Sequence, residues 1–312
     1  VLQAGLSLVA VLAIAGCSGP AGPLKGRASD EWTRTYTLQD GGEFQVVGAV
    51  GTIEVQGGDG PTVEVKAERI GRSATDEGAR PIPARIRLVE EVSPEKVVIR
   101  NDGLGGVQIG VEVEVNFHVT VPRGTKLRLR TAGGDITVSG VAGTVVASTT
   151  NGSITGSGLS GGVEARSTNG NITVTEELGD FRIGLIESTR RNVVLTGRHA
   201  DIIDSPNEEE FSGTTADVVG INLTFSAPEG HVGTFENPLE INSSNVSIGA
   251  GATLDGVVIE NSIVGDNATL SYMTLTESII SQGAGMHGTT LRLNLGAGSS
   301  GIMPTPTTQN GK

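Results

Sequence analysis

The stretch that decides the fold is TAGGDITVSGVAGTVVAS, from Thr131 to Ser148, followed at once by TTNGSITGSGLSGGVEAR and STNGNITVTEELGDFRIG. Each copy is 18 residues long and opens with the pattern T/S-x-G/N-G-x-I. A short repeat with brief strands and glycine corners is typical of a β-solenoid, in which each repeat is one coil stacked on the next. The sequence therefore predicts an all-β fold, a single-stranded parallel β-helix with 18-residue coils.

The same spacing predicts the core. Equivalent residues of successive coils should lie above one another, so aliphatic positions should stack in columns. The columns are Ile136, Ile154 and Ile172 on one side of the coil, and Val145, Val163 and Phe181 on the other. The Thr and Ser residues beside the isoleucines should point outward, either as a solvated ladder or as a carbohydrate-binding face.

Asparagine and glycine mark the corners of the predicted coils. Asn151-Gly152 and Asn169-Gly170 occupy equivalent places in two successive copies. Both residue types tolerate a positive φ angle better than other residues do. We therefore expect these two dipeptides to supply the residues of equivalent corners, where a positive φ angle can be needed.

The region before the repeat is also rich in strand signals. Residues 111–121 alternate between apolar and polar without an error, which predicts a strand with one buried face. His118 falls on the polar face of this strand and is expected to be solvated. Val55 and Val63 flank the turn residues 57–60, which indicates either a hairpin or a coil corner. No helix is predicted, because prolines bracket the one helical turn that residues 88–92 could form.

The amino terminus reads as an export signal. Residues 1–16 are almost wholly apolar and too few for a comfortable membrane span, which is typical of a secretory signal peptide. The run ends in IAGC at Cys17, which resembles the lipobox of bacterial lipoproteins. The resemblance implies that Cys17 is lipidated and anchors the protein to a membrane of the bacterial cell envelope. Ser18 after the cysteine favours the outer membrane if the bacterium has two membranes.

These features divide the chain into five segments. A signal peptide (1–16) and a flexible tether (17–31) precede an N-terminal β region (32–125), a β-solenoid (126–297) and a disordered tail (298–312). The composition agrees with small aliphatic layers, since 47 of the 312 residues are glycine and only 3% are aromatic. The net charge of −13 argues against nucleic acid as a partner, because phosphate binding needs clustered Lys and Arg.

Two family resemblances are visible. The segment 44–60, the junction 119–125 and the T/S-x-N/G-G-x-I repeats resemble the bacterial putative adhesin family, over roughly residues 40–200. That family implies surface exposure and supplies no catalytic residues to transfer. Residues 246–286 resemble the hexapeptide repeats of β-helical acyltransferases and sugar nucleotidyltransferases. Such enzymes use a histidine at the coil edge as a base, and His287 is the nearest candidate.

The common catalytic motifs are missing from the sequence. It contains no HExxH, no P-loop, no dinucleotide-binding glycine fingerprint and no GxSxG elbow. A single cysteine excludes an internal disulfide framework and a cysteine-rich zinc site. The aspartates expected at corners are interpreted as turn formers rather than calcium ligands: Asp59, Asp135, Asp255 and Asp266. We therefore expect neither a metal nor a cofactor.

The function that the sequence favours is non-catalytic. We expect a lipid-anchored cell-envelope protein that acts as an adhesin-like or scaffold module and contacts the membrane through the lipid on Cys17. Its further partner would be a surface glycan or protein. The alternative is an enzyme that modifies glycans or acyl groups on a β-helix scaffold.

Overall fold

The computed structural model describes residues 24–105, 109–177, 179–205, 217–227, 231–232 and 239–248, and then only short strands up to residue 295. From residue 244 onward, the backbone alone is described. The predicted signal peptide, Cys17 and the tail from residue 298 lie outside these residues.

Almost every described element is a strand, so the predicted all-β class is confirmed. The described residues contain two four-residue helices, α1 (Asp76–Ala79) and α2 (Ile82–Arg85). The strands are β1 (Gly26–Thr37), β2 (Glu43–Val47), β3 (Ile53–Gly58), β4 (Thr62–Ser73), β5 (Leu88–Val92), β6 (Lys96–Asn101), β7 (Val111–Pro122), β8 (Lys126–Gly133), β9 (Ile136–Ser139), β10 (Val145–Asn151), β11 (Ile154–Ser157), β12 (Val163–Ser167), β13 (Ile172–Glu176), β14 (Phe181–Ser188), β15 (Val193–Gly197), β16 (Ile202–Asp204), β17 (Val218–Ser226), β18 (His231–Val232), β19 (Glu240–Ile248), β20 (Thr253–Asp255), β21 (Val258–Glu260), β22 (Ile263–Val264), β23 (Thr269–Ser271), β24 (Thr274–Ile280), β25 (Gly285–His287) and β26 (Thr290–Leu295).

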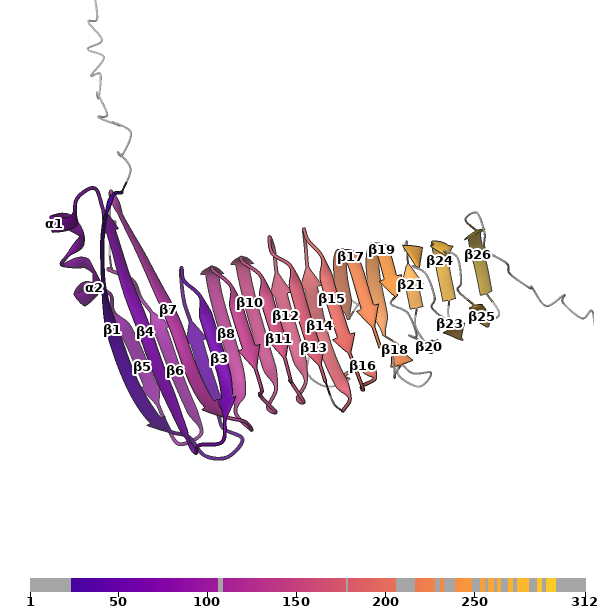
Figure 1. Cartoon of the computed structure of the whole chain (residues 1–312), viewed down its shortest axis with the longest axis horizontal. Coiled ribbons are helices and arrows are strands. Elements are labelled where there is room, and N and C mark those ends of the chain that lie inside the picture. The colour runs from indigo at the N-terminus through magenta and orange to yellow at the C-terminus, as the bar shows by residue number, and fades with distance from the viewer. Residues whose placement is uncertain are drawn as a thin grey trace, which may run out of the picture.

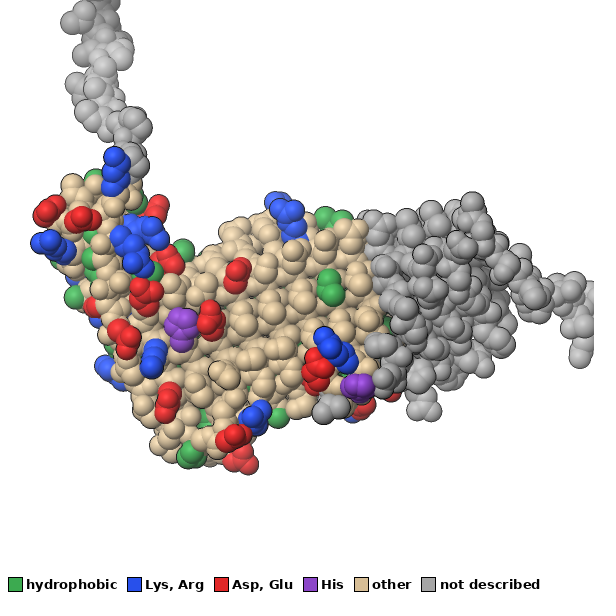
Figure 2. Space-filling view, in the orientation of Figure 1, with side chains coloured by type: hydrophobic (Ala, Val, Ile, Leu, Met, Phe, Trp, Pro, Cys, Tyr) green, Lys and Arg blue, Asp and Glu red, His purple; other side chains and the backbone are tan. Residues whose placement is uncertain are grey.

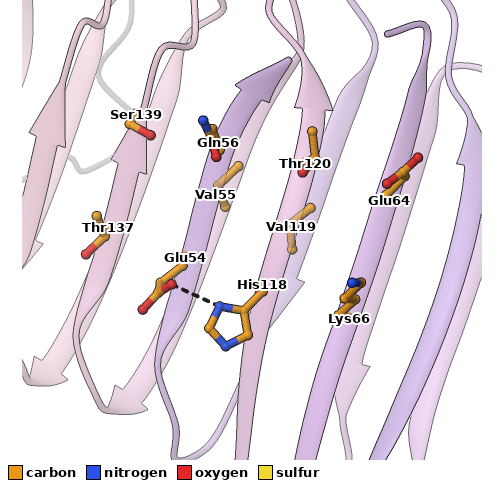
Figure 3. A pocket seen from close by; sticks show the side chains of 10 residues that line it. All are labelled: Glu54, Val55, Gln56, Glu64, Lys66, His118, Val119, Thr120, Thr137 and Ser139. Atoms are coloured by element: carbon orange, nitrogen blue, oxygen red, sulfur yellow. Dashed lines mark hydrogen bonds and ion pairs between the residues drawn. The ribbon is translucent and has the colours of Figure 1, made fainter. Parts of the chain in front are cut away.

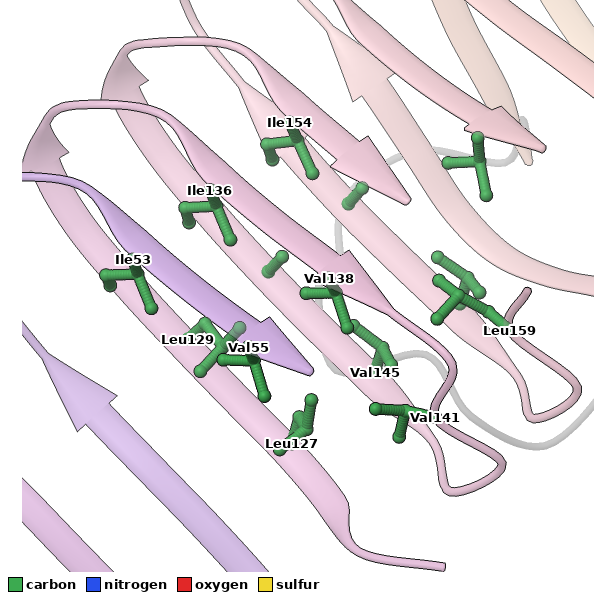
Figure 4. Packing of buried hydrophobic residues seen from close by; sticks show 14 of the residues in the cluster. Ile53, Val55, Leu127, Leu129, Ile136, Val138, Val141, Val145, Ile154 and Leu159 are labelled. Carbon is green, nitrogen blue, oxygen red and sulfur yellow. The ribbon is translucent and has the colours of Figure 1, made fainter. Parts of the chain in front are cut away.

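The strands form an elongated array that runs from β1 at one end to β26 at the other (Figure 1). One layer contains β3, β9, β11, β13, β15 and β17, each pairing in parallel with the next. The facing layer contains β2, β8, β10, β12 and β14, again paired in parallel. Aliphatic side chains of the two layers point toward each other and fill the space between them (Figure 4).

The isoleucine column lies in this core. Ile154 pairs with Ile136 on one side and with Ile172 on the other, at the interval of 18 residues. All three side chains are buried. Ile53 and Val193 extend the column at its two ends. No repeat buries its apolar face alone, so each one depends on the neighbours that cover it.

The stacked units begin much earlier in the chain than residue 126. Phe44 of β2 pairs with Leu127 of β8, while Ile53 of β3 pairs with Ile136 of β9. Strands β2 and β3 therefore form a unit of the same kind, and residues 59–125 are inserted between it and the next unit. The inserted segment hid this relation, because it breaks the 18-residue spacing that carries the repeat signal.

The inserted segment continues both layers beyond the first unit, since β7 pairs with β3 and β6 pairs in parallel with β2. Strand β7 lies between β3 and β4, with β3 parallel and β4 antiparallel to it, and β1 pairs antiparallel with β4. The turn at residues 57–60 is therefore not that of a hairpin between β3 and β4. Strand β1 begins at Gly26, so residues 26–31 are part of a strand rather than of the expected tether.

The expectation that the chain has no helix needs correction, because α1 and α2 are helical turns. Residues 88–92, the one stretch considered for a helical turn, form strand β5 just after them. Pro83 falls in the first turn of α2, where its missing N–H needs no partner within the helix. Thr75 caps α1, because its hydroxyl accepts a hydrogen bond from the backbone N–H of Gly78.

The register also departs from a strict 18-residue repeat. Val145 pairs with Val163 as expected, but Val163 pairs with Ile183, whereas Phe181 pairs with Ile202 of β16. The third copy has two more residues between Ile172 and Ile183 than the second copy has between Ile154 and Val163, so Phe181 is buried in the core but does not stack on Val163.

The last strands repeat at an interval shorter than 18 residues. Thr253 pairs with Thr269 and Thr269 with Gly285, which is 16 residues in each case. Three hexapeptides per coil would need a longer interval, so the spacing departs from the hexapeptide resemblance.

Glu43 ties the first stacked unit to its neighbours on both sides. Its carboxylate lies 2.7 Å from Lys96 Nζ of β6 and 3.4 Å from Arg128 Nε of β8. Burial alone would raise the pKa of Glu43, but the hydrogen bonds and charges of Lys96 and Arg128 outweigh it and lower the pKa. The charged form is therefore favoured by folding.

This arrangement predicts a pH-dependent effect of Glu43→Gln. A lowered pKa in the folded state gives stability above the pKa of the unfolded chain, which is lost as the pH falls. We expect the substitution to lower the free energy of unfolding by about 1 kcal/mol at pH 7, and the difference to shrink below about pH 4. Urea unfolding at several pH values measures it. The control Glu54→Gln, at an exposed ion pair, should change the free energy by less than about 0.5 kcal/mol, and an equal effect of the two at pH 7 would contradict the prediction.

Candidate binding face

The outward side chains of β9, β11 and β13 form two straight rows of hydroxyl groups. Each outward residue pairs in register with its equivalent in the next strand. We call the two rows on these three strands the hydroxyl face. Its residues are exposed or half-buried: Thr137, Ser139, Thr155, Ser157, Thr173 and Thr175. The rows continue through Thr196 of β15 and through Thr224 and Ser226 of β17, with Val194 the one apolar member.

The hydroxyl face carries no charged side chain. Neighbouring strands of a sheet are about 4.8 Å apart, and alternate residues along a strand are about 6.6 Å apart. The hydroxyls therefore lie on a two-dimensional grid of that spacing. Figure 2 shows this side of the molecule, with a broad central area free of charged side chains and with the charged groups gathered at its margins.

The two rows run on into the N-terminal strands, where charged or titratable residues replace the hydroxyls of the row that contains Thr137. Thr137 pairs with Glu54, Glu54 with His118, and His118 with Lys66. These side chains line a shallow hollow at the end of the hydroxyl face (Figure 3). Glu54 Oε2 lies 2.9 Å from His118 Nδ1, and both side chains are 55% exposed.

The His118–Glu54 pair was not predicted as a pair, since the two residues are 64 positions apart in the sequence. The alternation of β7 did place His118 on the outer face, where it lies. Neither side chain forms a further side-chain hydrogen bond or ion pair with a described residue. Its exposure makes it a surface ion pair of small energetic weight when the histidine is protonated.

The described residues show no metal-binding cluster of three or more His, Cys, Asp or Glu side chains. Asp59 pairs with Arg123, and Asp135 accepts a hydrogen bond from the backbone N–H of Ser153, so each has a structural partner. Asp266 lies outside the described residues, and so do the side chains of Asp255 and His287. Within the part of the chain searched, no helix is long and apolar enough to cross a membrane.

A second polar row borders the hydroxyl face at the corner before these strands. Asn169 Nδ2 donates to Asn151 Oδ1 at 2.8 Å, so the two predicted corner asparagines are directly linked. Further along, Asn171 Oδ1 accepts from the backbone N–H of Asn192 at 3.2 Å, and Asn222 Nδ2 donates to Asn192 Oδ1 at 2.7 Å.

The corner glycines are required for a different reason from the one expected. Gly152 and Gly170 are not among the glycines with a positive φ angle. Instead, a Cβ atom on Gly170 would overlap the carbonyl oxygen of Gly152, and one on Gly152 would overlap that of Gly134. Backbones of successive units approach so closely here that only hydrogen fits. Gly134, the equivalent glycine of the preceding copy, does have a positive φ of 136°, and at the opposite corner Gly140 and Gly158 have φ of 65° and 59°.

Comparison with known proteins gives distant structural likenesses only. No family model and no curated protein matches the chain. A solved putative cell adhesion protein from Clostridium sporogenes is 8% identical, with a TM-score of 0.29 over 69% of this chain and 100% of that one. A putative adhesin from Bacteroides fragilis is 11% identical, with a TM-score of 0.26 over 88% and 94% of the two chains. A putative lipid binding protein from Parabacteroides distasonis is 12% identical, with a TM-score of 0.25 over 88% and 97%. Likenesses at these scores carry no argument about function.

Proposed function

We propose that this chain is a lipid-anchored β-solenoid of the bacterial cell envelope that acts as a non-catalytic, adhesin-like binding module. The parallel, in-register pairing of successive 18-residue units supports the solenoid, because such pairing is what stacked coils produce. The lipobox-like IAGC at Cys17 supports the anchor. The partner of the module is a polysaccharide of the cell surface, which the hydroxyl face binds.

The observation that carries the binding role is the uncharged grid of hydroxyls. Thr and Ser hydroxyls both donate and accept hydrogen bonds, as sugar hydroxyls do. One such bond contributes only about 1 kcal/mol net, so a single sugar would bind weakly. A polymer with a repeating structure meets many equivalent positions at once, and the second and later contacts then form at high effective concentration. The repeated rows therefore suit a repeated ligand.

Removing the hydroxyls tests the binding role. The variant Thr137→Val/Thr155→Val/Thr173→Val keeps the shape and strand preference of these side chains but removes one row of hydroxyls. We expect it to lose at least about tenfold in affinity for the polysaccharides that the parent protein binds on a glycan array, since two lost hydrogen bonds already give that factor.

A matched control uses hydroxyls of the other layer. The variant Ser148→Val/Thr150→Val/Thr168→Val changes three residues on or next to β10 and β12 and should bind as the parent does. Circular dichroism establishes that both variants fold. Equal binding by the two variants would show that the hydroxyl face is not the binding surface.

The lipid anchor makes a separate prediction. Cys17→Ser should move the protein from the membrane fraction to the soluble fraction, because acyl chains give about 0.8 kcal/mol of membrane affinity per buried methylene. Expression with a complete export signal, followed by fractionation and immunoblotting, measures the distribution. Ser18→Ala keeps the cysteine and should leave the protein with the membrane. An unchanged distribution of Cys17→Ser would rule out the anchor.

A further inference from the structure

Two arginines lie beside the hydroxyl face, in the turn that precedes β15. They line a hollow of about 450 Å³ together with the asparagines of three successive units. We call this site the amide corner, and its arginine and asparagine members are Asn169, Asn171, Arg190, Arg191, Asn192 and Asn222. Asn171 and Thr173 are alternate residues of one extended segment, so the amide corner and the hydroxyl face adjoin on one side of the sheet.

The arginines keep their charge available for a ligand. Arg190 Nη1 makes a long hydrogen bond of 3.4 Å to the neutral Asn169 Oδ1. Neither Arg190 nor Arg191 forms an ion pair with any described residue, and both are exposed. Two adjacent positive charges without a carboxylate between them are unusual on a chain whose net charge is −13. The site therefore attracts an anion.

An apolar side chain lies at the same site. Ile221 is 45% exposed and lines the hollow, held there by the hydrogen bond of 3.0 Å from its backbone N–H to the carbonyl of Arg191. A small apolar contact beside amides and guanidinium groups fits a ligand that has C–H groups as well as polar and anionic ones. A sugar ring with an acidic substituent has this combination.

We propose that the amide corner binds the acidic groups of an anionic polysaccharide, whose neutral parts extend over the hydroxyl face. Guanidinium groups bind carboxylate and sulfate oxygens through paired, charge-assisted hydrogen bonds. The asparagine amides supply neutral donors and acceptors for the ring hydroxyls. This inference rests on the proposed function, since it names the ligand class that the same side of the molecule takes.

The test compares three polymers of different charge on the full-length protein. The probes are polygalacturonate, which carries carboxylates, dextran sulfate, which carries sulfate esters, and neutral dextran. We expect at least one anionic polymer to bind more tightly than dextran, with an affinity that falls as salt is raised. The anionic arm that binds more tightly identifies the acidic group.

The matched variants are Arg190→Gln/Arg191→Gln and Arg85→Gln/Arg130→Gln. Both change the net charge equally, but Arg85 ends helix α2 and Arg130 lies on β8 in the other layer. We expect the first variant to lose at least tenfold in affinity for the anionic polymer and the second to bind as the parent does. An equal loss in both would indicate unspecific charge attraction and would overturn the proposal, and so would no loss in either.

The variants of the hydroxyl face separate this inference from the proposed function. Loss of glycan binding in Thr137→Val/Thr155→Val/Thr173→Val, with none in Arg190→Gln/Arg191→Gln, would leave the binding face standing and refute the amide corner as an acidic-group site. Loss in the arginine variant alone would support the amide corner and refute the role of the hydroxyl rows.

Discussion

Ile154→Asp should destabilise the protein more than an aspartate at any other position of β11. The side chain of Ile154 is 3% exposed and lies between Ile136 and Ile172 of the neighbouring units. An aspartate there places a carboxylate between two apolar layers, where no described side chain offers it a partner. We expect a loss of about 4 kcal/mol in the free energy of unfolding and a fall of about 10 °C in Tm.

The adjacent residue supplies the control. Thr155→Asp introduces the same side chain one position along the same strand, but on the exposed face. Its effect should stay within about 0.5 kcal/mol. Thermal unfolding followed by circular dichroism measures both variants. Similar melting temperatures would contradict the assignment of Ile154 as inward and Thr155 as outward, and the hydroxyl face would then lose its basis.

The sequence predicts the fold where equivalent residues of successive repeats are separated by a constant interval. The column through Ile136, Ile154 and Ile172 follows from the interval alone, because equal spacing gives equal register. The unit at β2 and β3 has the same internal spacing, since Phe44 precedes Ile53 by nine residues, as Leu127 precedes Ile136. The nine-residue spacing of a stacked unit is therefore present at β2 and β3. It is hard to recognise because 67 inserted residues separate this unit from the other repeats.

The candidate sites were predictable to different degrees. The outward direction of Thr137 and its equivalents follows from the alternation of side chains along a strand. The amide corner does not follow from local patterns, because Asn169, Arg191 and Asn222 come from three units and meet only when the units stack. Arg190 and Arg191 are adjacent basic residues in the sequence, and such a pair alone indicates no more than a solvated corner.

Gly170→Ala should lower the free energy of unfolding more than the substitutions proposed at any other position, except Ile154→Asp. The added Cβ would overlap the carbonyl oxygen of Gly152, which is backbone and is fixed by the stacking of the units. The neighbouring hydroxyls hold Gly170 in place, since Ser167 Oγ accepts from its N–H at 2.9 Å and Ser188 Oγ donates to its carbonyl at 2.8 Å. We expect a loss of about 3 kcal/mol in the free energy of unfolding.

Two further glycines test why position 170 requires glycine: because two backbones approach closely there, or because of the conformation of its own backbone. Gly60→Ala places its Cβ in open space and should change the free energy by less than about 0.5 kcal/mol. Gly158 has a φ of 59° and no atom closer than 3.7 Å to the position of a Cβ, so Gly158→Asn should be tolerated, because asparagine adopts this conformation readily. Gly170→Asn should be at least as damaging as Gly170→Ala, since any Cβ meets the same carbonyl. Chemical denaturation of the four variants measures these differences. If Gly170→Asn were tolerated as well as Gly158→Asn, the approach of successive backbones would not be what requires glycine at this corner.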